Sequence, residues 1–446
     1  MDARPQRGAH PGDRGRHRHG GCRIGRARGI RDAPHSHRCI ARDLRRRNRA
    51  RAARDGLRVS GIRRARRRNA SRGAAMDALT ERAQPRWGRL LKRILVIAAG
   101  GAVAAVALLL AVSADARYIA RAGIEEARLL LRRRAIDKLI ADTTTPAALR
   151  QRFALVRAAR AYAADSLGLA VGKTYTTYAD VGRDTLLLVL SASRRDKLRE
   201  ITWRYPIVGI VPYKGFFNAS RARTEAQRLD VEGLDVFLRP SGAFSTLGYL
   251  SDPLFSTAMS RDTMELVATV IHELAHNTLY VKSQTPFNES FASFVGYRGA
   301  AAFFRSRHDT LDARRAAARW RDERTLDVFY AELARRLDSA YAEPLSGERL
   351  EQVRTALFGW ARDQFRGAVG QSLETYDWRW FAQAPLNNAV IIAERLYRMN
   401  LNLFDEIYLQ NNADIAETIR AIQIRVFTQP GDPYQALYSR PGMKVE

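Results

Sequence analysis

Two histidines and a glutamate have the spacing of a metal-binding helix. His272 and His276 stand four residues apart, with Glu273 directly after the first. Residues four apart in a helix share one face, so both imidazoles can bind one zinc ion. A catalytic zinc site adds a third protein ligand and a water whose pKa falls to about 7. Glu273 could accept the proton of that water as it attacks a carbonyl carbon, and then pass the proton to a leaving amine.

The third ligand is expected on the next element of the chain. Asn288-Glu289-Ser290 follows a turn at Pro286, so that two helices fold back on each other and Glu289 can face the two histidines. Ser293, one turn beyond Glu289, is expected to hydrogen-bond a ligand histidine. The predicted site holds one Zn²⁺ ion. The other carboxylates close in sequence are Asp252, Asp262 and Glu265, of which the last two lie too far along the axis of the same helix.

Hydrolysis also needs a donor for the developing oxyanion. Tyr249 and Tyr213 are the candidates, and for each the alternative is an ordinary half-buried aromatic side chain. Residues 246–250 are a candidate edge strand that would pair with a peptide backbone. Asn387 and Asn388 fit a role in substrate binding or in structure, and the sequence leaves that choice open.

The elements that position these residues are mostly helical. Arg261 to Lys282 is predicted to be the helix with the two histidines, and Phe287 to Phe304 the helix that follows. Further helices are expected over residues 118–164, 218–232 and from 305 to about 426, and extended segments over 185–190, 207–211, 234–238 and 241–250. The predicted fold class is α+β, with a small sheet beside two metal-binding helices in a mainly helical chain.

The formal net charge of +29 is concentrated at the N-terminus. Residues 1–75 contain 24 arginines, no lysine and five aspartates, which contribute +19. This segment lacks a sustained apolar period and is predicted to be disordered. Three explanations compete: a nucleic-acid-binding arm, a targeting peptide, or upstream GC-rich sequence translated from too early a start codon. We favour the last, because Met76 begins a coherent pattern, and we therefore expect no nucleic-acid partner.

Residues 76–116 have the pattern of an export signal or membrane anchor. Basic residues precede Ile94–Val112, a run of 19 uncharged residues that is just long enough to cross a bilayer core. Small residues around Ala114 and Ala116 suit signal peptidase, and whether the segment is cleaved remains open. The positive charge before the run predicts that residues 117–446 face the periplasm at a bacterial inner membrane.

The motifs together resemble a family of predicted bacterial zinc aminopeptidases. The resemblance rests on Val270–Tyr280 and Phe287–Ala292, and extends to segments 205–217, 244–253 and 386–389 in the same order. It implies a zincin-type core with His272, His276 and Glu289 as ligands and Glu273 as the base. Family members often end their export signal in a lipoprotein cysteine, which this chain lacks.

Two hypotheses follow for residues 117–446. The first is a zinc metallopeptidase, and more specifically an aminopeptidase, that acts on peptides or proteins. The alternative is a membrane-tethered binding or assembly factor with a non-catalytic zinc site. No Gly-x-Met-Glu-Asn segment, which one large aminopeptidase family uses, occurs in the chain.

Overall fold

The computed structural model describes residues 86–205, 209–241, 252–259 and 262–438. The chain divides into two units, residues 1–106 and residues 107–446. The predicted arginine-rich leader, residues 1–75, lies outside the described residues, as does the predicted edge strand of residues 246–250.

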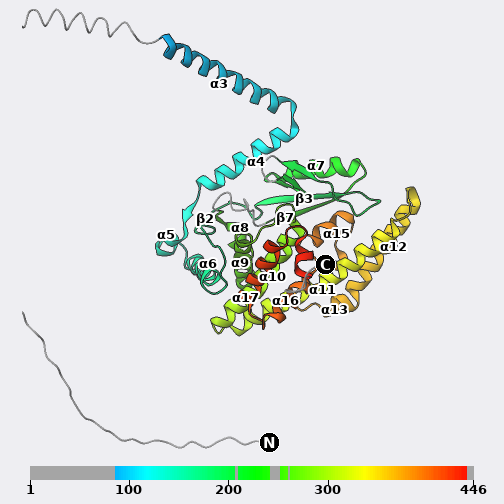
Figure 1. Ribbon diagram of the computed structural model, residues 1–446. Coiled ribbons are helices and arrows are strands. Elements are labelled where there is room, and N and C mark those ends of the chain that lie inside the picture. Colours follow the sequence, from blue (N-terminus) through cyan, green and yellow to red (C-terminus); the bar gives the residue numbers. More distant parts are fainter. Residues whose placement is uncertain (1–85, 206–208, 242–251, 260–261, 439–446) are drawn as a thin grey trace, which may run out of the picture. The chain divides into compact units, whose positions relative to one another are not determined.

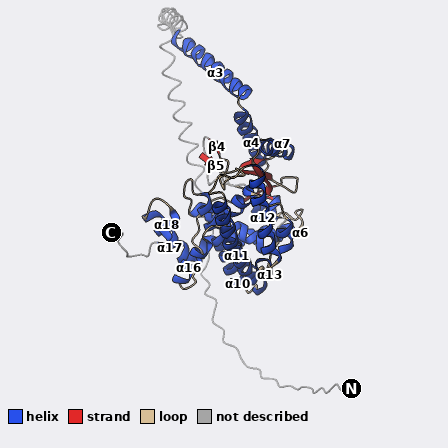
Figure 2. Ribbon diagram, turned by 90° about the vertical axis from the view of Figure 1, so that its right-hand side faces the viewer, coloured by secondary structure: helices blue, strands red, loops and turns tan. Residues whose placement is uncertain are grey.

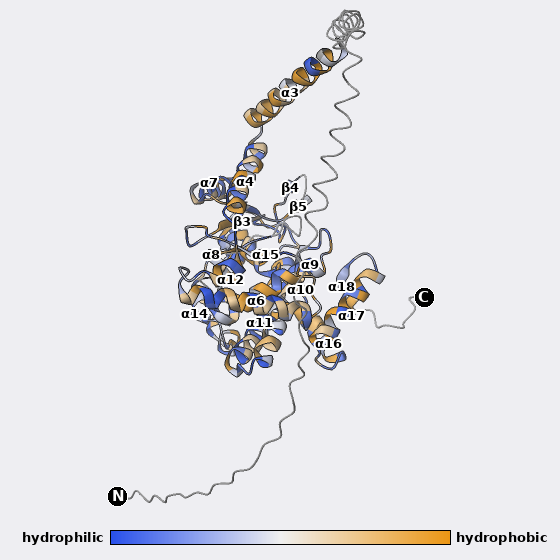
Figure 3. Ribbon diagram, turned by 90° about the vertical axis from the view of Figure 1, so that its left-hand side faces the viewer, coloured by the Kyte–Doolittle hydropathy of each residue, from blue (hydrophilic) through white to orange (hydrophobic). Residues whose placement is uncertain are grey.

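The first described element is the apolar helix α3 (Arg86–Val112). Its segment Leu90–Val112 has a mean hydropathy of 2.7 and no buried residue, and Figure 3 shows the same run as an almost unbroken apolar stretch. By length and composition this helix could cross a membrane. Signal sequences near an N-terminus have the same length and composition. The predicted apolar run, Ile94–Val112, lies within it.

Residues 107–446 form an α+β unit that is mainly helical, as predicted (Figures 1 and 2). Figure 2 shows the strands gathered at one end of a body of helices. In the described residues the strands make three small sheets, where the prediction has one. Their orders are β1 (Arg134–Ala135), β2 (Thr177–Ala179), β8 (Leu254–Phe255); β6 (Lys214–Phe216), β3 (Leu187–Ser193), β7 (Asp235–Ser241); and β4 (Trp203–Tyr205), β5 (Gly209–Val211).

The sheet β6-β3-β7 is antiparallel and covered on both faces. Leu190 of β3 pairs with Lys214 of β6 and with Leu238 of β7. Successive strand residues point to opposite faces, and Val189 and Leu190 accordingly enter two different apolar clusters. Burial on both faces explains why the first four residues of this strand, Leu187 to Leu190, are all apolar. The helices α7 (Ala219–Val231) and α15 (Asn388–Arg395) pack against the sheet.

The centre of the unit is the pair α9 (Thr263–Thr278) and α10 (Thr285–Ser306), which Figure 1 shows among the other helices. Asp262 caps α9 by accepting a hydrogen bond from the backbone N–H of Glu265 at 2.9 Å. Three aromatic side chains of α10 are fully buried: Phe287, Phe291 and Phe294. A helix with apolar residues around most of its circumference needs neighbours on most sides.

Those neighbours come from segments far apart in the chain. Around the pair, α6 (Ala147–Asp165), α16 (Leu401–Gln410) and α17 (Ile415–Thr428) share one apolar core. A second core joins α11 (Thr310–Ala340), α12 (Gly347–Arg366), α14 (Trp378–Gln383) and α15. The other helices in the described residues are α4 (Ala114–Leu131), α5 (Ile136–Ala141), α8 (Ser256–Met259), α13 (Ala368–Ser372) and α18 (Pro433–Tyr438).

Candidate metal centre

The two histidines of α9 share one face of the helix, as their spacing predicts. The ring centroids of His272 and His276 lie 5.0 Å apart, and the rings are nearly perpendicular. The side chain of His272 is 18% exposed and that of His276 only 6%. The ring of His272 is therefore partly accessible to solvent, whereas that of His276 is nearly buried.

Glu289 reaches both histidines from the first turns of α10. Its Oε2 lies 3.3 Å from Nε2 of His272 and 3.7 Å from Nε2 of His276. The three donor atoms all lie within 4.8 Å of one another. The helix α10 begins at Thr285, two residues before its predicted start, because proline is well tolerated in the first helical turn.

Asn288 fixes the turn that brings Glu289 into place. Its side-chain amide donates to the backbone oxygen of Val281 and accepts from the backbone N–H of the same residue, both at 2.8 Å. The Asn288 side chain is almost completely buried, and this double hydrogen bond satisfies both of its polar ends. The position of Glu289 relative to α9 is thus set by the residue directly before it.

Two glycines of α10 allow the helices to approach closely. A Cβ atom at Gly296 would lie 2.9 Å from the backbone oxygen of Ala268 and 3.1 Å from Cβ of His272. At Gly299 it would lie 2.9 Å from a methyl of Leu167 and 3.0 Å from one of Ile271. Neither residue was predicted from the sequence. A glycine inside a helical pattern, which costs about 1 kcal/mol relative to alanine, is the signal that could have found them.

The donor set fits a zinc ion. Ligand atoms at zinc–nitrogen and zinc–oxygen distances near 2.0–2.2 Å stand about 3.3–3.6 Å apart in a tetrahedron. The two Nε2–Oε2 distances, 3.3 and 3.7 Å, are close to that spacing. Two imidazoles, one carboxylate and no cysteine is also a composition found in catalytic zinc sites.

The environment keeps Glu289 in the form that binds a cation. Burial raises the pKa of Glu289, but His276 and His272 lower it by more, so that its pKa lies well below the usual range. The carboxyl group is therefore ionised at neutral pH, and a carboxyl group must be deprotonated to bind a metal. Burial lowers the pKa of His276, while the Glu289 carboxylate raises it by more.

The pKa of Glu273 is shifted in the opposite direction to that of Glu289. Burial raises its pKa, the two histidines lower it, and Glu289 and Asp252 raise it further, so that the pKa lies above its usual value. A carboxylate with a raised pKa is a stronger base, which suits a group that must take a proton from water.

Ser293 and Tyr249 were also predicted for the site, and of these two the structure describes only Ser293. Ser293 is buried one turn beyond Glu289, yet it forms no hydrogen bond to either histidine within the described part of the chain. Nδ1 of His276 is buried and has no hydrogen-bond partner among the described residues. Tyr249 lies outside the described residues, together with the predicted edge strand of residues 246–250.

Tyr213 lies between β5 and β6 and packs against the apolar cluster of β3. Burial raises its pKa, and the Glu289 carboxylate raises it further, so the phenol is near the candidate site. Tyr397 and Arg239 also lie near Glu289, and the sequence analysis missed both. No local pattern could have found them, because each comes from a segment far from the histidines in the sequence.

Asn387 and Asn388 have structural contacts. Asn388 is fully buried, and its amide donates to the backbone oxygens of Arg194 and Arg195 at 2.9 and 3.1 Å. Asn387 accepts from the backbone N–H of Val390 and so caps α15. Both residues attach α15 to the sheet.

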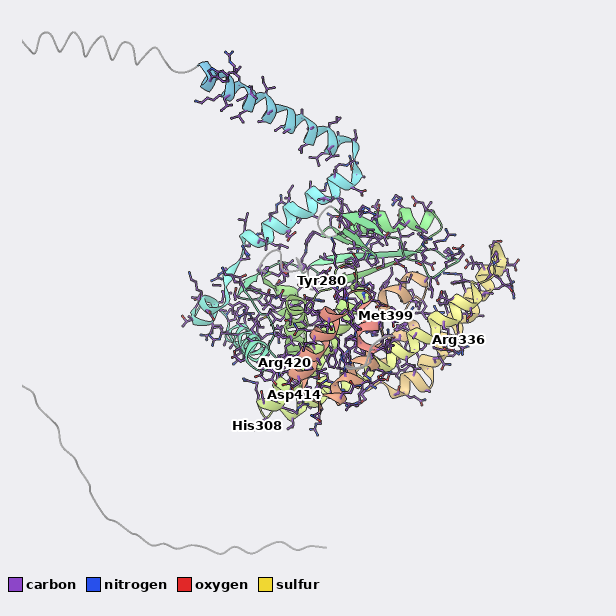
Figure 4. The ribbon with its side chains drawn as sticks, in the orientation of Figure 1. Tyr280, His308, Arg336, Met399, Asp414 and Arg420 are labelled. Carbon is purple, nitrogen blue, oxygen red and sulfur yellow. The ribbon has the colours of Figure 1, made fainter. Side chains whose placement is uncertain are left out.

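The third histidine after Met76 stands apart from this group. His308 is exposed and follows the C-terminal end of α10, whereas Glu289 lies near the N-terminal end. The intervening helix is about 25 Å long at 1.5 Å per residue. Figure 4 shows His308 at the rim of the unit and Tyr280, just after α9, nearer its middle. His308 is therefore no part of the cluster.

Comparison with known proteins finds one family over most of the chain. The family described as "Putative aminopeptidase" matches residues 117–428. This segment begins after α3 and contains His272, Glu273, His276 and Glu289. Among curated proteins no match is found, and none is found among solved structures.

Proposed function

The chain belongs to the family described as putative aminopeptidases, and we propose that it is a zinc-dependent metallopeptidase that hydrolyses peptide bonds. One zinc ion is held by His272, His276 and Glu289. The convergence of their three donor atoms, within 4.8 Å of one another, is the observation that supports this most strongly. The ligand role of Glu289, the base role of Glu273 and the zincin-like nature of the core are parts of the same proposal.

Glu273 is the proton carrier of the reaction. When bound, the ion supplies Lewis-acid activation of the attacking water and of the substrate carbonyl. Glu273 accepts a proton as the water oxygen bonds to the carbonyl carbon and the π electron pair moves onto the carbonyl oxygen. The carbon–nitrogen bond then breaks as that pair returns, and Glu273 gives its proton to the leaving amine. The products are a carboxylic acid and an amine.

Aminopeptidase action is the narrower part of the proposal and rests on the family description. The location proposed for this activity is the periplasmic face of a bacterial inner membrane. It is supported by the basic residues before Ile94 and by the length of the apolar helix α3. The catalytic domain then corresponds to residues 117–446, with residues 76–116 as signal or anchor.

Substitution of Glu273 by glutamine tests whether the site is catalytic. The full chain, purified in detergent, is assayed on a peptide library and analysed for metal. We expect Glu273→Gln to keep one zinc per chain and to lower kcat by about 10²–10⁴-fold, the usual contribution of a general base. Glu348→Gln, an exposed change in the first turn of α12, is the matched control with unchanged activity.

A binding factor with a non-catalytic zinc site would behave differently. It would bind zinc but leave every peptide intact, in the wild-type chain as in the variant. That result would overturn the proposed function.

A further inference from the structure

Tyr397 lies in a short linker that is fastened beside Glu289. The linker joins α15 to α16. Within it, the backbone N–H of Met399 donates to Oγ of Ser290 at 3.1 Å, and the backbone oxygen of Met399 accepts from the hydroxyl of Tyr434 at 3.0 Å. Met399 is labelled in Figure 4. Because Ser290 directly follows Glu289, these bonds hold the linker against the turn of α10 that contains the candidate ligand.

The hydroxyl of Tyr397 is oriented by an arginine from the sheet. Nη2 of Arg239, on β7, donates to the Tyr397 hydroxyl oxygen at 3.3 Å, and its guanidinium carbon lies 5.3 Å from the ring centroid. A guanidinium can only donate. The tyrosine oxygen is therefore the acceptor, and its own proton remains available for a second partner. In the described ranges, no protein acceptor takes that proton.

The hydrogen bond from Met399 to Ser290 brings Tyr397, two residues earlier in the linker, close to Glu289, and the pKa of the phenol agrees with this position. Burial raises its pKa, the Glu289 carboxylate raises it further, and Glu273 adds to the rise, whereas Arg239 lowers it. Tyr397 is thus under the influence of both the proposed ligand and the proposed base. A phenol that is neutral and next to a cationic donor is a good hydrogen-bond donor to a developing negative charge.

We propose that Tyr397 donates the hydrogen bond that stabilises the anionic oxygen of the substrate, and that Arg239 is its positioning residue. This inference rests on the proposed peptidase function and deepens it. As the electron pair of the C=O bond moves onto oxygen, the Tyr397 hydroxyl shortens its hydrogen bond to that oxygen without transferring its proton. When the carbon–nitrogen bond breaks and the pair returns, the hydrogen bond weakens again.

The two sequence-based candidates have less support for this role. Tyr213 is close to Glu289, but no side chain in the described residues donates to its hydroxyl. Tyr249 lies outside the described residues. Tyr280, which follows α9, is 41% exposed, and a water-exposed donor is worth less than one in a desolvated site.

The test compares Tyr397→Phe with the wild-type full chain in three measurements: kcat and KM on a cleaved peptide, bound zinc, and affinity for the phosphinic pseudodipeptide Ala-ψ[PO₂CH₂]-Ala. This compound resembles the tetrahedral intermediate. We expect kcat to fall about 10²–10³-fold, as for loss of one oxyanion donor, with KM within about threefold. Bound zinc stays at the wild-type level and phosphinate affinity falls about 100-fold. Tyr438→Phe, an exposed change on α18, is the control that alters none of these quantities.

Arg239 is tested through its coupling to Tyr397. Arg239→Gln lowers kcat and phosphinate affinity about tenfold, and Arg239→Lys restores part of the loss because it keeps a cationic donor. Since Arg239 acts through Tyr397, the double variant Tyr397→Phe/Arg239→Gln is no worse than Tyr397→Phe alone. A purely structural role of Arg239 would give additive losses and no rescue by lysine.

The results that overturn the proposal are distinct from those that overturn the proposed function. If the wild type cleaves peptides and Tyr397→Phe keeps kcat and phosphinate affinity within threefold, Tyr397 is not the donor. The same conclusion follows if Tyr213→Phe, rather than Tyr397→Phe, produces both losses. If the zinc-loaded wild type neither cleaves peptides nor binds the phosphinate, the peptidase function fails and this inference fails with it.

Discussion

Glu289 is an ionised carboxylate with two imidazole nitrogens within 3.7 Å of one of its oxygens. Such a cluster attracts a cation, because the carboxylate supplies negative charge and the imidazoles supply lone pairs. The side chains of His272 and Glu289 are each 18% exposed, so the cluster is partly open to solvent. The residue that most strongly determines metal affinity is thus expected to be Glu289.

Glu289→Gln removes the negative charge while keeping the shape of the side chain. We expect the dissociation constant for zinc to rise by at least about 100-fold, since even the loss of an outer partner of a ligand costs 10–100-fold. Competition with a chromogenic chelator measures the constant on the full chain. Glu417→Gln, an exposed change on α17, is the control with unchanged affinity. Equal zinc affinity in Glu289→Gln and the wild type would remove Glu289 from the ligand set.

The two histidines and Glu289 were predicted to be neighbours from features that lie close together in the sequence. A spacing of four in a helix and a turn at Pro286 are short-range features. The approach of Tyr397 and Arg239 was not predictable in this way, because it depends on how α15, β7 and α10 pack. Ser293 was predicted from helix periodicity alone, and this periodicity gives the face of a residue but not its hydrogen-bond partner.

At the scale of elements, the site depends on the distance between α9 and α10. Gly296 lies directly against the backbone of Ala268 and against His272, and Asn288 clamps the connecting turn. The closeness of the two helices therefore sets the separation of the nitrogen donors from the Glu289 carboxylate. A change in helix packing should affect metal binding even where no ligand is altered.

Gly296→Ala tests this dependence. The added methyl would meet backbone and Cβ atoms at 2.9 and 3.1 Å, so the helices must move apart. We expect unfolding free energy to fall by about 1–3 kcal/mol, as for other overpacked sites, and zinc affinity to fall as well. Urea unfolding and chelator competition on the full chain measure the two effects.

The matched control is Gly359→Ala in α12, where a Cβ meets nothing within 4 Å. There the substitution should raise stability by about 0.5–1 kcal/mol, because alanine loses less backbone entropy than glycine. If Gly296→Ala is as harmless as Gly359→Ala, helix spacing does not control the site.

Long periodic elements were predicted more reliably than short ones. The helices α9 and α10 and the strand β3 were expected close to their observed bounds. The three-residue strands β4 and β6 were not expected, because three residues are too few to establish an alternating pattern. Their pairing depends on partners elsewhere in the chain.

The distribution of charge and the apolar helix α3 distinguish the strongly basic N-terminal segment of the sequence from the mildly basic remainder. Residues 76–446 have only a mildly basic balance, +10, and no cysteine, which is compatible with an oxidising periplasm. The helix α3 includes the candidate membrane span Leu90–Val112, in which no residue is buried. A membrane or the secretion machinery would be the natural environment of such a helix.

Export can be tested with a reporter. Alkaline phosphatase fused after Glu446 should be active in bacterial cells, because it folds only outside the cytoplasm. Val103→Arg combined with Leu108→Arg should abolish this activity, since each charge costs about 2.5–3.5 kcal/mol at the centre of a spanning helix. Replacing two exposed residues of α11, Leu311→Arg and Val328→Arg, is the control. An inactive wild-type fusion would place the domain in the cytoplasm.

The relation between bound zinc and peptide cleavage is the strongest test of the proposed zinc-dependent hydrolysis. The full chain is stripped of metal with a chelator and reloaded with zinc in steps, and the cleavage rate is measured at each zinc content. We expect the rate to be abolished by stripping and to rise linearly until one zinc is bound per chain. Cleavage that persists without metal, or one tightly bound zinc with no cleavage of any peptide, would contradict the account.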